Sequence, residues 1–118
     1  AFTPGSHGTT FGGHPVSCAA ALAEVGELLD RDLAGNAEKM GTYFMEKLAK
    51  IPHVKEVRGQ GLLVGVEFDD AIYGLDSHLL ITAIGVHTIR MVPPLIITEE
   101  NCDQAAAIIE ETVKALSE

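Results

Sequence analysis

The sequence lacks positive charge. Eight lysines and arginines stand against seventeen aspartates and glutamates, which gives a formal net charge of −9. A chain of this sign repels the phosphates of nucleic acids and the anionic surface of membranes. We therefore expect neither nucleic acid nor membrane as a partner.

Long apolar runs are also missing. No stretch reaches the roughly 18 residues of a membrane span, and no basic segment with an apolar signal core follows the N-terminus. The 118 residues are 47% hydrophobic and 21% charged, enough for one buried core and unlike a disordered tail. These features predict a soluble, cytoplasmic domain. Because the chain begins Ala-Phe-Thr-Pro rather than with Met, we expect it to be a piece of a longer protein.

Residues that usually carry chemistry are few. Cys18 and Cys102 lie far apart in apolar helical patterns, which predicts two buried free thiols. The five histidines lack the spacing of a metal site, and neither Ser6 nor Ser17 lies in a Gly-x-Ser-x-Gly turn. No lysine has the glycine-rich, desolvated setting of a reactive amine. The chain thus shows no complete catalytic set and no metal site.

The N-terminal part reads as a loop followed by two helices. Residues 3–15 are rich in Gly, Pro, Ser and Thr and predict a loop, and Pro15 suits the first turn of a helix over 15–33. Asn36 is a candidate N-cap for a second helix that ends before Pro52. The apolar stripe of the first helix is Cys18, Leu22, Val25 and Leu29, and that of the second is Met40, Phe44 and Leu48.

The rest of the chain reads as strands and a last helix. Branched residues predict strands over 54–58 and 62–68 around a glycine turn, and a hairpin of 79–84 with 88–92 around Gly85. Thr98 can cap the last helix, whose inward residues are expected to be Cys102, Ala105, Ile109 and Leu116. Residues 69–78 are weakly patterned. This order predicts a small α/β (α+β) sandwich with a mainly antiparallel sheet covered by helices.

The opening loop presents two hydroxyls, Thr9 and Thr10, between glycines and ahead of a helix. Hydroxyl and backbone N–H donors presented together can hold a phosphate or a carboxylate without a net positive charge. A glycine-rich loop can equally be only a turn. Composition alone leaves both interpretations open.

Arg90 lies on the predicted strand 88–92. Alternation places it with Thr88 and Val92 on one face, while Ile89 and Met91 take the other. Its guanidinium can form a structural ion pair, or it can clamp a substrate carboxylate with two parallel hydrogen bonds. Arg58 beside the glycine turn has the same two interpretations, with the structural one favoured.

Three segments resemble successive motifs of one enzyme family. They are PGSHGTTFGGHP (4–15), VRGQGLLVGVEF (57–68) and IRMVPPLIIT (89–98). In this order they resemble class III aminotransferases, the fold-type I enzymes that use pyridoxal 5'-phosphate. Through residues 79–101 the chain is most similar to acetylornithine and ornithine aminotransferases.

The resemblance implies a C-terminal segment. Residues 1–34 would close the large cofactor domain with its loop and long helix, and 35–118 would form the small domain. The lysine and aspartate that act on the cofactor would lie upstream, so the fragment alone is expected to be inactive. The complete enzyme would be a homodimer that transfers the amino group of acetylornithine or ornithine to 2-oxoglutarate in arginine metabolism.

The resemblance also assigns roles to residues. Thr10, with Thr9 beside it, matches the threonine that binds the cofactor phosphate of the neighbouring subunit. Arg90 matches the arginine that binds the substrate α-carboxylate. His14 departs from the usual Asn before Pro15, and 69–78 is shorter than the usual helix there. From the residues alone, a standalone anion-binding module or a dimerisation element remains the alternative.

Overall fold

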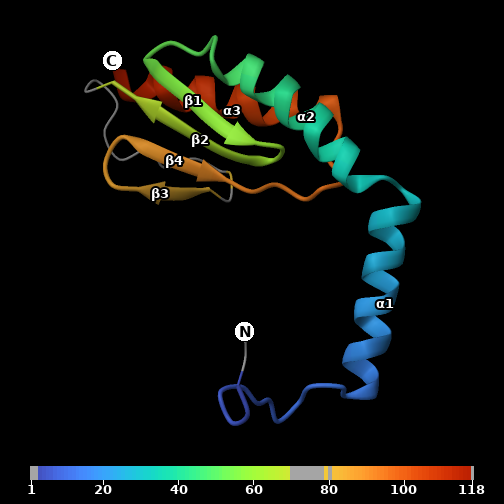
Figure 1. Cartoon of the computed structure of the whole chain (residues 1–118). Coiled ribbons are helices and arrows are strands. Elements are labelled where there is room, and N and C mark those ends of the chain that lie inside the picture. The colour runs from blue at the N-terminus through green and yellow to red at the C-terminus, as the bar shows by residue number, and fades with distance from the viewer. Residues whose placement is uncertain (1–2, 70–78, 80, 118) are drawn as a thin grey trace. The chain divides into compact units, whose positions relative to one another are not determined.

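The computed structural model describes residues 3–69, 79 and 81–117 (Figure 1). The chain divides into two compact units, residues 1–32 and 33–118. No helix in the described part is both long enough and apolar enough to cross a membrane.

The first unit contains the opening loop and helix α1, Pro15–Asp30. Pro15 occupies the first turn as expected, because a proline there loses no helical hydrogen bond. His14 is the N-cap residue, and its side chain makes no capping hydrogen bond. The prediction that Cys18 is buried is wrong: it is exposed, since nothing described in this unit covers the apolar stripe of α1. The helix also ends three residues earlier than expected.

Helix α2, Leu33–Leu48, opens the second unit. The expected apolar stripe is confirmed, because Met40, Phe44 and Leu48 are all buried. The prediction that Asn36 caps the helix is wrong. Asn36 lies inside α2, and its side-chain amide donates hydrogen bonds to the backbone carbonyls of Leu95 (2.6 Å) and Ile97 (3.2 Å). This amide is engaged in a long-range contact and is therefore not used as a cap.

The sheet has four strands in the order β1-β2-β4-β3, and every pair is antiparallel. The expected glycine turn and the hairpin around Gly85 are both present, and the second hairpin's first strand is shorter than predicted. The predicted connection 69–78 lies outside the described residues except for Asp69. The strands are β1 Val54–Gln60, β2 Leu63–Phe68, β3 Thr82–Ile84 and β4 Thr88–Met91.

Helix α3, Glu99–Ser117, closes the chain. Thr98 caps it as expected, because its hydroxyl accepts a hydrogen bond from the backbone N–H of Asn101 (3.3 Å). Cys102 and Ile109 are buried, as predicted. Leu116 is not: it is 42% exposed in the last turn of α3, and the inward positions of this helix are instead completed by Ala106 and Val113.

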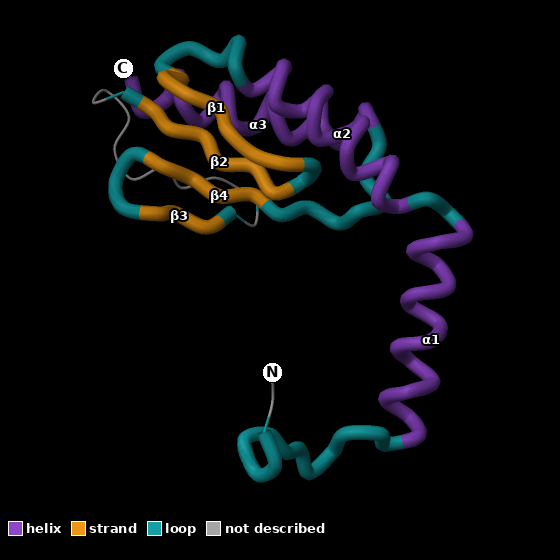
Figure 2. The backbone as a smooth tube through the Cα atoms, viewed as in Figure 1, coloured by secondary structure: helices purple, strands orange, loops and turns teal. Residues whose placement is uncertain are grey.

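Helices α2 and α3 pack on one another and cover one face of the sheet (Figure 2). Alternation directs the apolar residues of β2 and β4 toward these helices. The expected sandwich of helices on an antiparallel sheet is thus confirmed. The buried core consists of Met40, Phe44, Leu48, Ile51, Leu62, Val64, Val66, Phe68, Ile89, Met91, Cys102, Ala106, Ile109 and Val113.

A polar contact also joins the two helices. The Asp103 carboxylate of α3 accepts a hydrogen bond from the Tyr43 hydroxyl (3.0 Å) and lies 2.9 Å from the Lys47 ammonium, both on α2. The Lys47 ammonium is 5.0 Å from the centre of the Tyr43 ring. Hydrogen bonds from Lys47 first and Tyr43 second hold the pKa of Asp103 below its ordinary value of 3.8. Hydrogen bonding to Asp103 first and Tyr43 second raises the pKa of Lys47.

This pKa shift predicts a pH-dependent contribution to stability. Because the folded pKa of Asp103 lies below its unfolded value, the stabilisation is present above that value and is lost as pH falls through the folded pKa. We expect Asp103→Asn to lower the urea midpoint at about pH 7, and the difference from the natural protein to shrink below about pH 4.

The matched control is Glu111→Gln. Glu111 is an exposed carboxylate on the same helix that forms no ion pair with any described residue. Its substitution should leave the urea midpoint unchanged at both pH values. Equal effects of the two substitutions, or an Asp103→Asn effect that persists in acid, would show that the Asp103 contact does not stabilise the helix pair.

Candidate functional site

The sheet face opposite α2 and α3 carries the polar side chains of the strands, and we call it the open face. One row crosses all four strands here, because residues paired in antiparallel register project to the same side. Strand by strand, from β1 to β3, this row is Arg58, Gly65, Arg90 and Thr82.

Arg90 lies in the middle of this row. Its strand neighbours Ile89 and Met91 are 2% and 5% exposed on the covered face, whereas Arg90 itself is exposed, as alternation predicted. Its guanidinium forms no ion pair with any residue in the described ranges. An unpaired arginine presents a planar fork of donors that matches a carboxylate.

A shallow hollow of about 350 Å³ lies on the open face around Arg90. Gly65 on β2 is paired with Arg90 and has no side chain. The surface is therefore hollowed between Arg58 and Arg90. All four strands contribute residues to the lining of the hollow. They include Arg58, Leu63, Ile84, Thr88 and Arg90. The hollow is open enough for a small carboxylate to reach the Arg90 guanidinium.

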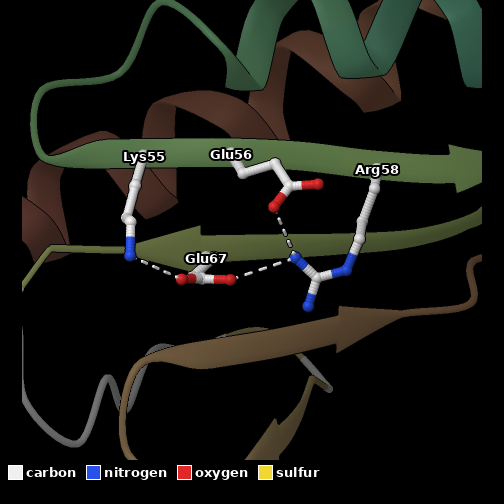
Figure 3. Close-up of polar contacts among 4 residues, drawn as sticks. All are labelled: Lys55, Glu56, Arg58 and Glu67. Carbon is white, nitrogen blue, oxygen red and sulfur yellow. Dashed lines mark hydrogen bonds and ion pairs between the residues drawn. The ribbon is translucent and has the colours of Figure 1, made fainter.

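Arg58 has the structural role that its sequence favoured. Its Nη1 lies 3.1 Å from a carboxylate oxygen of Glu56 and 3.1 Å from one of Glu67. The Lys55 ammonium lies 3.0 Å from the other Glu67 oxygen, so the carboxylate is held between two cations (Figure 3). Hydrogen bonds from Lys55 first and Arg58 second lower the pKa of Glu67.

The sequence did not single out Lys55 or Glu67. Alternation along residues 62–68 could have placed Glu67 on the polar face, but pairing it with Lys55 needs the strand register. That register shifts between Val54 and Glu56, the stretch of β1 that contains Lys55. A shift of this kind has no clear signature in the residues around it.

Thr9 and Thr10 lie in the opening loop of the first unit, and both are exposed. Neither hydroxyl makes a hydrogen bond within the described part of the chain. Gly12 lets the loop fold closely, because a Cβ there would overlap the Thr9 methyl group. Gly5 and Gly13 take positive φ values of 83° and 77°, which favour glycine.

Because Thr9 and Thr10 are exposed, the loop can offer their hydroxyls as donors to an anion. A phosphate group fits such donors, because its oxygens accept several hydrogen bonds at once. The hydroxyls of Thr9 and Thr10 belong to the first unit and the guanidinium of Arg90 belongs to the second.

None of the chain's five lysines is desolvated. Four of them, Lys39, Lys47, Lys55 and Lys114, lie within 3.3 Å of a carboxylate oxygen, and their side chains are 39–71% exposed. Lys50 is exposed as well. Exposed, paired ammonium groups lack the setting of a reactive amine. In the described part, no group of three or more His, Cys, Asp or Glu side chains is placed to hold a metal ion.

Known proteins share both the sequence and this arrangement. The family model of class-III aminotransferases matches residues 1–113. The chain belongs to the class-III aminotransferases. These enzymes depend on pyridoxal phosphate, whose phosphate is the kind of anion to which exposed hydroxyls can donate.

Individual aminotransferases match over nearly the whole chain. Ornithine aminotransferase 2 of Staphylococcus aureus is 45% identical over 111 residues, 88% of this chain and 28% of its own length. Acetylornithine aminotransferase of Methanothermobacter thermautotrophicus is 39% identical over 98% of this chain and 32% of its own.

A solved aminotransferase structure is also similar to this chain. Ornithine aminotransferase of Toxoplasma gondii, which holds pyridoxal phosphate at partial occupancy in its active site, has a TM-score of 0.80 and 38% identity over 97% of this chain and 30% of that one. The chain spans about a third of the length of these relatives.

Proposed function

We propose that this chain is the C-terminal segment of an enzyme that transfers the amino group of acetylornithine or ornithine to 2-oxoglutarate. The observation that carries the proposal is Arg90, an exposed guanidinium that no described carboxylate neutralises, in a hollow on the open face. The similarity to both ornithine and acetylornithine aminotransferases supports this substrate class.

Arg90 binds the α-carboxylate that amino-acid and 2-oxo-acid substrates have in common. Two parallel hydrogen bonds from the planar guanidinium fix both the position and the rotation of that carboxylate. Fixing the carboxylate orients the adjacent carbon, from which a proton must be removed and to which one must be returned. Pyridoxal phosphate, when bound, supplies the electron sink for this chemistry.

Thr10, assisted by Thr9, donates hydrogen bonds to the cofactor phosphate. In the proposed homodimer this phosphate belongs to the site of the neighbouring subunit. The enzyme is proposed to be cytoplasmic, and residues 1–34 and 35–118 are proposed to be the end of its cofactor domain and its small domain. The division of the described chain near residue 32 supports that boundary.

The reactive lysine is proposed to lie in a part of the enzyme beyond these 118 residues. The exposure and ion pairing of the lysines in this chain support this, as does its match to about a third of its relatives' length. The isolated chain is therefore expected to have no aminotransferase activity.

The phosphate contact is tested by Thr10→Val in the intact enzyme. Valine keeps the shape of threonine but removes the hydroxyl donor. Because a hydrogen bond to a charged group contributes about 1.5–3 kcal/mol, we expect the dissociation constant of pyridoxal phosphate to rise roughly tenfold or more. A fluorescence titration of the cofactor-free enzyme measures this constant.

Thr42→Val is the matched control. The Thr42 hydroxyl donates to the backbone carbonyl of Glu38 within α2 and is exposed. This substitution should leave the cofactor dissociation constant unchanged. If both variants bind pyridoxal phosphate as tightly as the natural enzyme, Thr10 has no role in holding the phosphate.

A further inference from the structure

Glu67 is the carboxylate of the open face that the strand register brings nearest to Arg90. Glu67 on β2 is paired with Thr88 on β4. Arg90 lies two residues beyond Thr88 on β4, and its side chain is on the same face of the sheet. Such diagonal neighbours have Cβ atoms roughly 7 Å apart, which is within reach of long side chains. Glu67 is therefore placed to form an ion pair with Arg90 and neutralise it.

In the structure Glu67 pairs with two other cations instead. One carboxylate oxygen accepts from Lys55 at 3.0 Å and the other from Arg58 at 3.1 Å, and both cations belong to β1. Figure 3 shows the Glu67 carboxylate lying between these two side chains. Both of its oxygens are thus engaged by cations of β1, and neither forms an ion pair with Arg90.

Arg58 has a second effect through Glu56. Glu56 and Glu67 face each other in the β1–β2 register, and like charges directly opposite one another repel. The same Nη1 of Arg58 lies 3.1 Å from each of them. Without this cation, repulsion from Glu56 would favour positions of the Glu67 carboxylate that are farther from Glu56 and nearer to Arg90.

We propose that Lys55 and Arg58 are positioning residues that hold Glu67 away from Arg90, so that the Arg90 guanidinium stays free for a substrate carboxylate. This inference rests on the proposed function of Arg90. Glu67 can compete at neutral pH because a glutamate carboxylate is ionised there even without these two cations, which lower its pKa further.

The test is a double-mutant cycle in the intact enzyme, with the KM for 2-oxoglutarate and kcat as readouts. Lys55→Gln/Arg58→Gln should raise this KM about two- to sixfold, the range expected when one exposed ion pair competes with the substrate. The change in kcat should be smaller, since the competitor leaves Arg90 once the substrate is bound. Arg58→Gln alone gives a smaller shift in the same direction, and provides the test if the pair does not fold.

Adding Glu67→Gln decides the mechanism. If the released Glu67 forms an ion pair with Arg90, Glu67→Gln in the Lys55→Gln/Arg58→Gln background should reverse most of the rise in KM. In the natural background Glu67→Gln should change KM less. If the cations act only through their charge at a distance, Glu67→Gln changes KM by the same factor in both backgrounds. Such additivity, or no rise in KM for the paired variant, overturns the proposal.

Two further variants separate this inference from the proposed function. Arg31→Gln removes another exposed arginine that is paired with a carboxylate, Glu27 at 3.2 Å on α1, and should not change KM. If Arg90→Gln also leaves KM unchanged, the role of Arg90 itself is wrong. If Arg90→Gln raises KM but the cycle is additive, only the role of Lys55 and Arg58 is wrong.

Discussion

Arg90→Ala in the intact enzyme should raise the KM for both the amino-acid and the 2-oxo-acid substrate by about a hundredfold or more, since two parallel hydrogen bonds are lost. Each charge-assisted hydrogen bond contributes about 1.5–3 kcal/mol, and tenfold in affinity corresponds to about 1.4 kcal/mol. Both substrates are affected because they share the α-carboxylate. The effect on kcat should be smaller, and steady-state kinetics with each substrate varied in turn measures both constants.

Arg90→Lys should fall between the natural enzyme and Arg90→Ala. A lysine keeps the charge, but its ammonium cannot form two parallel hydrogen bonds to one carboxylate. Arg31→Ala, which removes an exposed arginine from α1, is the control and should leave both KM values as they are. An unchanged KM in Arg90→Ala would refute the assignment of this residue.

Gly41→Ala should destabilise the second unit by about 1–3 kcal/mol, the usual cost of forcing extra atoms into a packed site. Gly41 is buried on α2, where a Cβ would overlap the backbone carbonyl oxygen of Gly61 in the turn between β1 and β2. The obstacle is backbone, which cannot rotate aside as a side chain can. The helix propensity that alanine gains over glycine, about 1 kcal/mol, is included in this net value. Urea denaturation followed by circular dichroism measures the loss.

Gly26→Ala is the matched control, since it places the same substitution in helix α1. A Cβ at residue 26 meets no atom within 4 Å in the described chain. Only the higher helix propensity of alanine then remains, so this variant should not be destabilised. If Gly41→Ala is as stable as Gly26→Ala, then α2 and the turn at Gly61 do not pack as closely as the structure shows.

Most elements could be predicted from the sequence because local signals and tertiary packing agree for them. Thr98 is followed by a helix whose first carboxylates suit its N-terminus, and the cap forms as expected. Gly85, with a φ of 70°, makes the turn between two short strands. The alternation around Arg90 fixed its face, because Ile89 and Met91 could only be buried.

The wrong predictions concern residues whose environment is set from far along the chain. Asn36 has the chemistry of a cap, yet its amide binds carbonyls about sixty residues away. Cys18 and Leu116 lie on apolar helical stripes, but a stripe shows only which residues can be buried together. It does not show whether a neighbour covers them.

Only part of the candidate site could be predicted, because the rest depends on contacts between residues far apart in the sequence. The position of Arg90 on a polar face follows from one strand alone. The contact of Lys55 and Arg58 with Glu67 needs two strands in a known register, together with the irregularity near Val54. The threonines of the opening loop were found through their setting among glycines, but hydroxyls in such a loop indicate an anion of no particular kind.

The role of Arg90 is tested most directly by comparing an amino-acid substrate with the amine that lacks only its α-carboxylate. The quantity measured is the ratio of the two kcat/KM values, in the natural enzyme and in Arg90→Ala. If Arg90 binds the carboxylate, the substitution lowers kcat/KM for the amino acid at least tenfold and leaves that for the amine almost unchanged, so the ratio collapses. An equal loss for both substrates, with the ratio preserved, would contradict a contact between this guanidinium and the substrate carboxylate.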